Sequence, residues 1–255
     1  MLIVISPAKI LNFKPQNTVQ DYTMPEFIDR ADILMKELRK LKPKDIAGLM
    51  KVNKSIAELN FQRFANWQLP FTPENSKQAV LAFNGEVYNG LKASTLNLAD
   101  ISFAQEHLRI LSGLYGILRP LDLIQPYRLE MSIKLLTKGK KDLYKFWGSK
   151  ITDSLNRSLK QMKKPYLINL ASAAYFKSIH LKKLIAPVIS IEFWENKNEE
   201  YKVIVVYTKK ARGMMGRFAI QNEITNPQDL KAFDYDGYNF NPRFSTEWKW
   251  IFTRK

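Results

Sequence analysis

Short apolar runs alternate along this chain with segments of helical periodicity, and this alternation limits the choice of fold more than any other feature. Most of the runs are rich in Val, Ile, Phe or Tyr, or are bounded by turn residues, as buried strands are. We predict strands at residues 2–6, 79–84, 108–112, 166–171, 188–194, 201–208 and 248–253. Strands that alternate with helices indicate the α/β class, with a mostly mixed β-sheet flanked by helices.

The helical segments between these runs have recognisable ends. Thr23-x-x-Glu26 has the form of a capping box, and so has Ser102-x-x-Gln105. Residues 143–163 place apolar side chains on one helical face and stop before Pro165. Because no Gly/Ser-rich linker and no repeat divides the chain, we expect a single domain, residues 1–255, with a helical insertion at about residues 25–75.

Composition excludes several classes of protein. The chain has 255 residues, of which 45% are hydrophobic, too many for a disordered chain, and no cysteine for disulfides or thiolate zinc sites. Its two histidines, His107 and His180, lack the spacing of a metal site, so we predict no metal and no cofactor. No apolar run is long enough to span a bilayer and no basic leader precedes the first strand. We therefore expect a cytoplasmic protein without a membrane partner, and we leave its oligomeric state open.

The charge balance gives the first positive indication of a partner. The net charge is +16 at pH 7, and ten basic residues face two acidic ones between residues 132 and 165. Seven basic residues face three acidic ones between residues 32 and 54. Such concentration favours a polyanion, because each neutralised phosphate releases condensed counterions. The alternative is a solvated, lysine-rich surface that only keeps the protein soluble.

Polar clusters follow three of the predicted strands, where open α/β sheets place their sites. Ser6-Pro7-Ala8-Lys9 follows the first strand, and Phe83-Asn84-Gly85-Glu86-Val87-Tyr88 combines a turn signal with a carboxylate and a phenol. The densest cluster runs through residues 111–122 and 125–131. From these segments we take as catalytic candidates the side chains of Lys9, Glu86, Ser112, Tyr115, Arg119, Asp122, Tyr127, Arg128 and Glu130. The competing interpretations are ordinary turns and a structural network of ion pairs.

A fourth cluster carries cations around a Gly-x-x-Gly pattern at Gly213 and Gly216. Loops of this form can clamp a nucleic-acid backbone, although the pattern is frequent. The cations of this cluster are Lys209, Lys210, Arg212 and Arg217. Ser172, which precedes a predicted helix, fits a helix N-cap better than a nucleophile because no histidine lies near it in the sequence.

The wording and order of these clusters resemble the YaaA family of peroxide stress proteins. The matching run Ser-Gly-Leu-Tyr-Gly-x-Leu-Arg-Pro-Leu-Asp lies within residues 111–122, and further matches lie at residues 6–9, 83–88, 125–131, 169–172, 209–213 and 237–240. Together they span essentially the whole chain.

The resemblance implies a role in surviving hydrogen peroxide by keeping unincorporated iron low. It also implies a basic cleft and DNA binding through a helix-hairpin-helix-like element. That element would comprise residues 42–67 with its hairpin at Lys51-Val52-Asn53, which lacks the central glycine usual in such motifs. The cations of this element are Lys44, Lys51, Lys54 and Arg63. Together with the four cations of the fourth cluster they are the predicted nucleic-acid contacts.

Two functions remain open at the level of sequence. In the first, the protein binds duplex or branched DNA through its backbone, independently of base sequence. In the second, it is an enzyme acting on a nucleotide or a nucleic-acid base. Lys9, Arg119 and Arg128 would then hold an anion, and Glu86 or Glu130 would serve as acid or base. Direct iron binding is the least attractive function, since the chain offers no cysteine and only isolated histidines.

Overall fold

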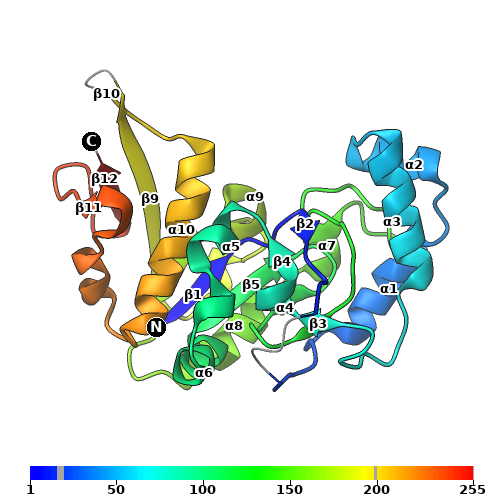
Figure 1. Ribbon diagram of the computed structural model, residues 1–255, viewed down its shortest axis with the longest axis horizontal. Coiled ribbons are helices and arrows are strands. Elements are labelled where there is room, and N and C mark those ends of the chain that lie inside the picture. The colour runs from blue at the N-terminus through cyan, green and yellow to red at the C-terminus, as the bar shows by residue number, and fades with distance from the viewer. Residues whose placement is uncertain (16–19, 198–199, 255) are drawn as a thin grey trace.

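The fold is built on a mixed sheet whose centre is parallel (Figure 1). The computed structural model describes residues 1–15, 20–197 and 200–254. The parallel strands, in spatial order, are β12 (Lys249–Arg254), β9 (Val188–Lys197), β8 (Leu167–Leu170), β1 (Leu2–Ile5) and β5 (Leu108–Ser112). Antiparallel strands complete the sheet: β6 (Gly116–Leu118), β10 (Glu200–Lys202) and β11 (Asn239–Phe240). The mixed α/β prediction is confirmed.

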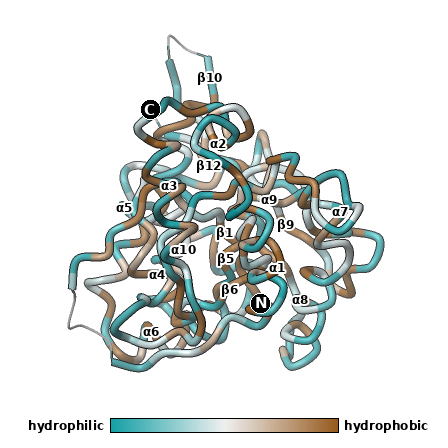
Figure 2. Tube along the Cα trace, turned by 90° about the vertical axis from the view of Figure 1, so that its right-hand side faces the viewer, coloured by the Kyte–Doolittle hydropathy of each residue, from teal (hydrophilic) through white to brown (hydrophobic). Residues whose placement is uncertain are grey.

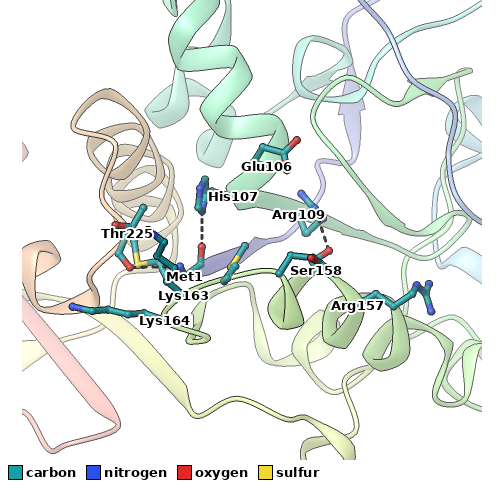
Figure 3. Close-up of a pocket in the computed structure, with 11 residues that line it drawn as sticks. Met1, Glu106, His107, Arg109, Arg157, Ser158, Lys163, Lys164 and Thr225 are labelled. Carbon is teal, nitrogen blue, oxygen red and sulfur yellow. Dashed lines mark hydrogen bonds between the residues drawn. The ribbon is translucent and has the colours of Figure 1, made fainter.

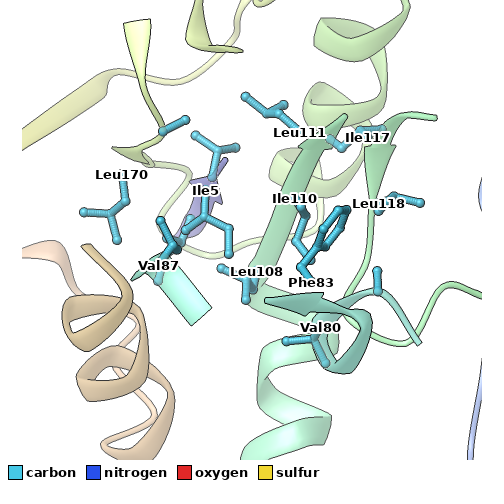
Figure 4. Packing of buried hydrophobic residues seen from close by; sticks show 14 of the residues in the cluster. Ile5, Val80, Phe83, Val87, Leu108, Ile110, Leu111, Ile117, Leu118 and Leu170 are labelled. Carbon is cyan, nitrogen blue, oxygen red and sulfur yellow. The ribbon is translucent and has the colours of Figure 1, made fainter. Parts of the chain in front are cut away.

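Helices cover both faces of this sheet. Figure 2 places α4 (Ala79–Ala82), α5 (Glu86–Leu91), α6 (Leu98–His107) and α10 (Val205–Gln221) on one side of β1, β5 and β6. On the other side lie α7 (Leu143–Trp147), α8 (Lys150–Lys160) and α9 (Ala173–Phe176). Strands covered on both faces are mainly apolar, and every residue of β1 and β5 is buried, with Arg109 and Ser112 the two polar residues among them. Figure 4 shows this packing, with Ile5 and Leu170 near Val87 of α5.

Three further helices gather at one end of the molecule, away from β9 and β10 (Figure 1). They are α1 (Ile28–Leu38), α2 (Pro43–Met50) and α3 (Lys54–Asn66). Lys51, in the left-handed region with a φ of 50°, ends α2, and the Asn53 side chain caps α3 by accepting from the Ile56 amide at 2.9 Å. The structure thus has a helix on each side of the Lys51-Val52-Asn53 turn, while a DNA-binding role for this pair stays a prediction.

The remaining elements are short. Two-stranded pairs join β2 (Ile10–Leu11) to β4 (Phe83–Asn84) and β3 (Lys77–Gln78) to β7 (Leu123–Ile124). The 3-10 helices are η1 (Ala93–Thr95), η2 (Leu181–Lys183), η3 (Pro227–Ala232) and η4 (Tyr235–Gly237).

Five of the seven predicted strands exist, and two were wrong. Residues 79–82 form α4, and only Phe83–Asn84 are extended, because a buried apolar run lacks the periodicity that separates strand from helix. Residues 201–208 divide between β10 and the first turn of α10, whose Val205 and Val206 are exposed. There the tertiary structure overrides the strand propensity of β-branched residues.

The helix ends also differ from the predictions. The Thr23 hydroxyl donates to Asp122 Oδ1 at 2.6 Å and caps no helix, and α1 begins only at Ile28. Ser102 lies inside α6, which starts after a capping box formed by Asn97 and Asp100. Residues 143–163 form two helices, since Gly148 takes a φ of +52° between α7 and α8.

The predicted Gly-x-x-Gly loop is part of helix α10, so the clamp interpretation was wrong. A Cβ on Gly213 would collide with the carbonyl oxygen of Val87, and one on Gly90 with that of Lys210. These glycines let α10 and α5 cross backbone against backbone, as small residues do at tight helix contacts. The pattern therefore serves helix packing.

Gly213→Ala should lower the free energy of unfolding by roughly 1–3 kcal/mol or prevent folding, because the added methyl separates α5 from α10. Gly216→Ala is the matched control. A Cβ there would meet only Leu91 Cδ1 at 3.7 Å, so the better helix propensity should raise stability by about 0.5–1 kcal/mol. Urea denaturation measures both, and equal effects would contradict the close crossing.

Candidate functional site

A cavity of about 330 Å³ lies where β1 and β8 end. The chain passes from β1 to its neighbour β5 and then returns to β8 on the opposite side of β1. The loops after β1 and β8 therefore diverge from a switch point, the place where open α/β sheets form ligand crevices. Residues 6–10 line the cavity from the first loop, and Ser172, Ala174 and Tyr175 line it from the second.

One wall carries a chain of charges centred on Glu130. Lys9 Nζ lies 3.0 Å from one oxygen of the Glu130 carboxylate, and the Arg128 guanidinium lies 3.1 Å from the other. The Arg128 side chain is only 15% exposed, and its Nε is buried without a hydrogen-bond partner among the described residues. One carboxylate thus serves two cations, which leaves the wall with a positive charge in excess.

Helix α10 presents two more cations to the same cavity. Lys209 and Arg212 both line it, and neither has an ion pair within residues 1–15, 20–197 and 200–254. The Nε of Arg212 is buried and has no partner in that part of the chain. Burial lowers the pKa of Arg212, with Glu192 opposing the shift, but a guanidinium stays protonated. Arg212 is therefore a charged donor without an acceptor.

Three tyrosines form the more apolar part of the lining. The Tyr88 hydroxyl donates to the Ser6 carbonyl oxygen at 3.2 Å, and the Tyr127 hydroxyl lies 2.7 Å from Ser112 Oγ. Burial raises the pKa of Tyr88 and Tyr127, and it raises that of Tyr175 with help from the Glu130 charge. All three phenols are therefore neutral at physiological pH. Tyr88 and Tyr127 are almost fully buried, whereas Tyr175 is partly exposed and has the more accessible ring.

Hydroxyls and a second carboxylate complete the lining. The Ser172 amide donates to Ser6 Oγ at 2.9 Å, and the two serine hydroxyls lie 3.3 Å apart. Ser172 occupies the N-cap position of α9, but its side chain caps nothing there. Glu86, the first residue of α5, accepts a hydrogen bond from Asn89 at 3.0 Å.

The structure therefore brings together part of the predicted catalytic set. Those that line the cavity are Lys9, Glu86, Tyr127, Arg128 and Glu130. Ser112 lies behind Tyr127, fully buried. Tyr115 accepts from Trp67 Nε1 at 3.1 Å inside the core.

Arg119 and Asp122 lie outside the cavity. They form an ion pair of 3.1 Å, and the Arg119 amide donates to the same carboxylate at 2.8 Å. Since Thr23 is also bound to Asp122, this network ties two distant loops together.

The predicted nucleic-acid residues also separate. Lys209 and Arg212 line the cavity, whereas Lys210 pairs with Asp236 at 3.7 Å and Arg217 donates to the carbonyl oxygens of Leu91 and Lys92. The remaining four lie on α2, α3 and the turn between them: Lys44, Lys51, Lys54 and Arg63. The sequence did not indicate that α10 faces the loop holding Lys9, and it named Tyr175 only as part of a helix.

A second cavity, of about 750 Å³, opens at the amino ends of the same strands (Figure 3). Its polar groups largely serve the fold. The His107 ring stacks on Phe103 and bonds to the Met1 carbonyl oxygen at 2.8 Å, and Arg109 is held by Ser158 at 3.2 Å and by backbone oxygens. Helices α6 and α8 turn their carboxyl ends toward this cavity, which disfavours anions. We therefore take the cavity after β1 and β8 as the candidate site.

Within the part of the chain that the structure describes, no group of three or more His, Cys, Asp or Glu side chains is placed to hold a metal ion. No helix of the described residues has the length and apolar character needed to cross a bilayer.

Fold and cavity define a mixed α/β protein with a cation- and tyrosine-lined site at a strand switch point. Residues 1–244 match the family model described as "Peroxide stress protein YaaA", and the chain belongs to that family. The resemblance inferred from the motifs is thereby confirmed.

Curated relatives match along essentially their whole length. A "UPF0246 protein" of Dechloromonas aromatica (strain RCB) is 51% identical over 255 residues, which is 100% of this chain and 99% of the relative. A second, from Neisseria meningitidis serogroup B, is 52% identical over 254 residues, covering 100% of this chain and 98% of the relative. A third, from Acaryochloris marina, is 52% identical over 254 residues and is covered completely.

Asp122→Ala should lower the free energy of unfolding by roughly 2–3 kcal/mol, because it leaves the Arg119 amide and the Thr23 hydroxyl without their buried acceptor. Asp153→Ala, which removes an exposed carboxylate bonded to Ser149, is the control and should change stability little. Chemical denaturation compares them. A small effect at Asp122 would show that its network does not hold the loops.

Stability should also fall at acid pH through His107. Burial lowers the pKa of His107, with smaller and opposing effects from its backbone bond and neighbouring charges. As the pH falls below about 6.5, the His107 ring is protonated in the unfolded chain before it is protonated in the folded protein. The free energy of unfolding therefore falls as the pH drops from about 6.5 through the lower pKa of the folded state. His107→Gln should flatten this dependence in denaturation curves between pH 7.5 and 5. An unchanged slope in His107→Gln would refute the assignment.

Proposed function

We propose that this cytoplasmic peroxide stress protein binds DNA through its sugar–phosphate backbone, independently of base sequence, at the cavity after β1 and β8. The observation that carries the proposal is that Lys9, Arg128, Lys209 and Arg212 face one cavity among whose described lining residues only Glu86 and Glu130 are acidic. Cations from two loops and from helix α10, three segments more than 80 residues of chain apart, converge there. Convergent lysine and arginine side chains are what phosphates require.

Arg63 extends this positive surface toward α3. Burial lowers the pKa of Arg63, and the nearby charge of Arg128 lowers it further, so the two guanidiniums are close enough to repel each other. A phosphate between two such groups would relieve that repulsion. This repulsion supports one path for a DNA strand, from α3 past Arg128 to the cavity.

The lining tyrosines fit the same partner. Basic grooves that follow a nucleic-acid strand commonly combine cations with aromatic faces, on which bases stack without regard to sequence. Tyr175, the partly exposed tyrosine of the lining, supplies such a ring in the same cavity as Arg128 and Arg212.

The link to stress is proposed in the same terms. A protein that covers the backbone shields DNA from radicals made by unincorporated iron and hydrogen peroxide. In a plasmid-nicking assay with Fe²⁺ and peroxide, saturating protein should therefore slow strand breakage. Unchanged nicking at saturation would refute this part of the proposal.

Replacing Lys209 and Arg212 together by glutamine should weaken binding to a duplex of any sequence by about ten-fold at low salt, and the loss of two phosphate contacts should reduce the salt slope by about 1.8. The matched control removes the same charge at the opposite cavity, in Lys163→Gln/Lys164→Gln. Fluorescence anisotropy from 50 to 200 mM salt measures both. Equal losses in the two variants would show that net charge, and not this cavity, binds DNA.

A second candidate is an enzyme acting on a nucleotide or a nucleic-acid base, favoured by the placement of Glu86 and Glu130 inside a partly enclosed cavity. Lys9 and Arg128 would hold the anion and one carboxylate would act as acid or base. Arg119, paired with Asp122 outside the cavity, has no part in this version. Incubation with nucleotides and oligonucleotides, analysed by mass spectrometry for the protein and for Glu86→Gln and Glu130→Gln, tests it.

A further inference from the structure

We infer that the cavity after β1 and β8 receives a single nucleotide that has left the base stack of a DNA strand. The inference rests on the proposed DNA binding and adds which form of DNA this site prefers. The size of the cavity, its lining and two buried guanidinium Nε atoms without hydrogen-bond partners among the described residues support it.

The volume of the cavity suits a single nucleotide and is too small for a duplex. A volume of about 330 Å³ lies at the lower end of small-molecule sites, which span about 300–1,000 Å³. Paired and stacked DNA stays outside such a space, so only a base turned out of the helix reaches the tyrosines. Proteins that handle single bases solve the same problem by extruding the nucleotide.

The lining suits a base of any identity. The rings of Tyr88, Tyr127 and Tyr175 remain neutral because burial raises the pKa of each phenol. A neutral aromatic ring stacks on any base, and Tyr175 is the partly exposed ring of the three. The adjacent hydroxyls of Ser6 and Ser172 can both donate and accept at the base edge.

The guanidinium groups of Arg128 and Arg212 are placed to bind the phosphate of the nucleotide. Arg128 and Arg212 each bury an Nε that has no hydrogen-bond partner within the described residues, and both side chains line the cavity. Buried donors in native proteins are nearly always paired, so these two call for an acceptor from a ligand. Lys209, exposed on α10 one turn before Arg212, can contact the next phosphate along the strand.

The test compares two labelled duplexes that differ only in one unpaired nucleotide. We expect at least ten-fold tighter binding of the duplex with the unpaired nucleotide, because the protein no longer spends free energy on breaking a base pair. Equal affinity for both would overturn the inference and leave the proposed DNA binding intact. Failure to bind either duplex at 50 mM salt would overturn the proposed function itself.

Single-residue variants then test whether this cavity causes the preference for the duplex with the unpaired nucleotide. Tyr175→Ala and Arg212→Gln should each reduce it to less than two-fold, whereas Tyr175→Phe, which keeps the ring, should retain it. Tyr22→Ala, an exposed tyrosine that does not line the cavity, is the control and should bind as the unaltered protein does. Circular dichroism checks the fold. If Tyr175→Ala unfolds, Arg212→Gln decides, because Arg212 makes no hydrogen bond or ion pair within the described residues that its replacement would break. A preference that survives both substitutions would place the unpaired nucleotide elsewhere and overturn the inference.

Discussion

The position of β1 between β8 and β5 is the constraint on which the rest of the structure depends. Each residue of this strand is buried, and its backbone is hydrogen-bonded in parallel to a neighbour on either side. Parallel strands end at the same edge of a sheet, so the loops after β1 and β8 meet whatever their separation in sequence. The cavity with Lys9 and Tyr175 is a consequence of that pairing.

The crossing of α5 and α10 supplies the other half of the site. Gly90 and Gly213 let the two backbones approach so closely that α10 lies directly beside the first turn of α5. That approach brings Arg212 to the cavity opposite the segment that holds Lys9. Gly213, one of the two glycines in a pattern that looks like a ligand-binding loop, thus acts indirectly, by positioning a helix.

The candidate site is distinguished by whether its cations have partners within the protein, more than by the net charge of the whole chain. Of residues 132–165, which hold ten of the basic residues, only Ser132 lines the cavity. Many cations elsewhere are bound within the fold, as Arg217 is by backbone oxygens and Arg109 by Ser158. Arg212 has no such partner among the described residues, and this makes it more informative than the net charge of +16.

The sequence by itself determined the fold class, the family and most of the sheet, because a strand such as β1 is apolar throughout and is followed by clear turn residues. It also located Glu130 and Arg128, since a dense polar segment after a strand stands out in the sequence. Only the tertiary structure decided that Asp122 ties two loops together, that residues 205–208 are helical, and that Arg212 shares a cavity with Lys9. The physical reason is that strand order and helix crossing arise from contacts between distant segments, which local periodicity and composition do not encode.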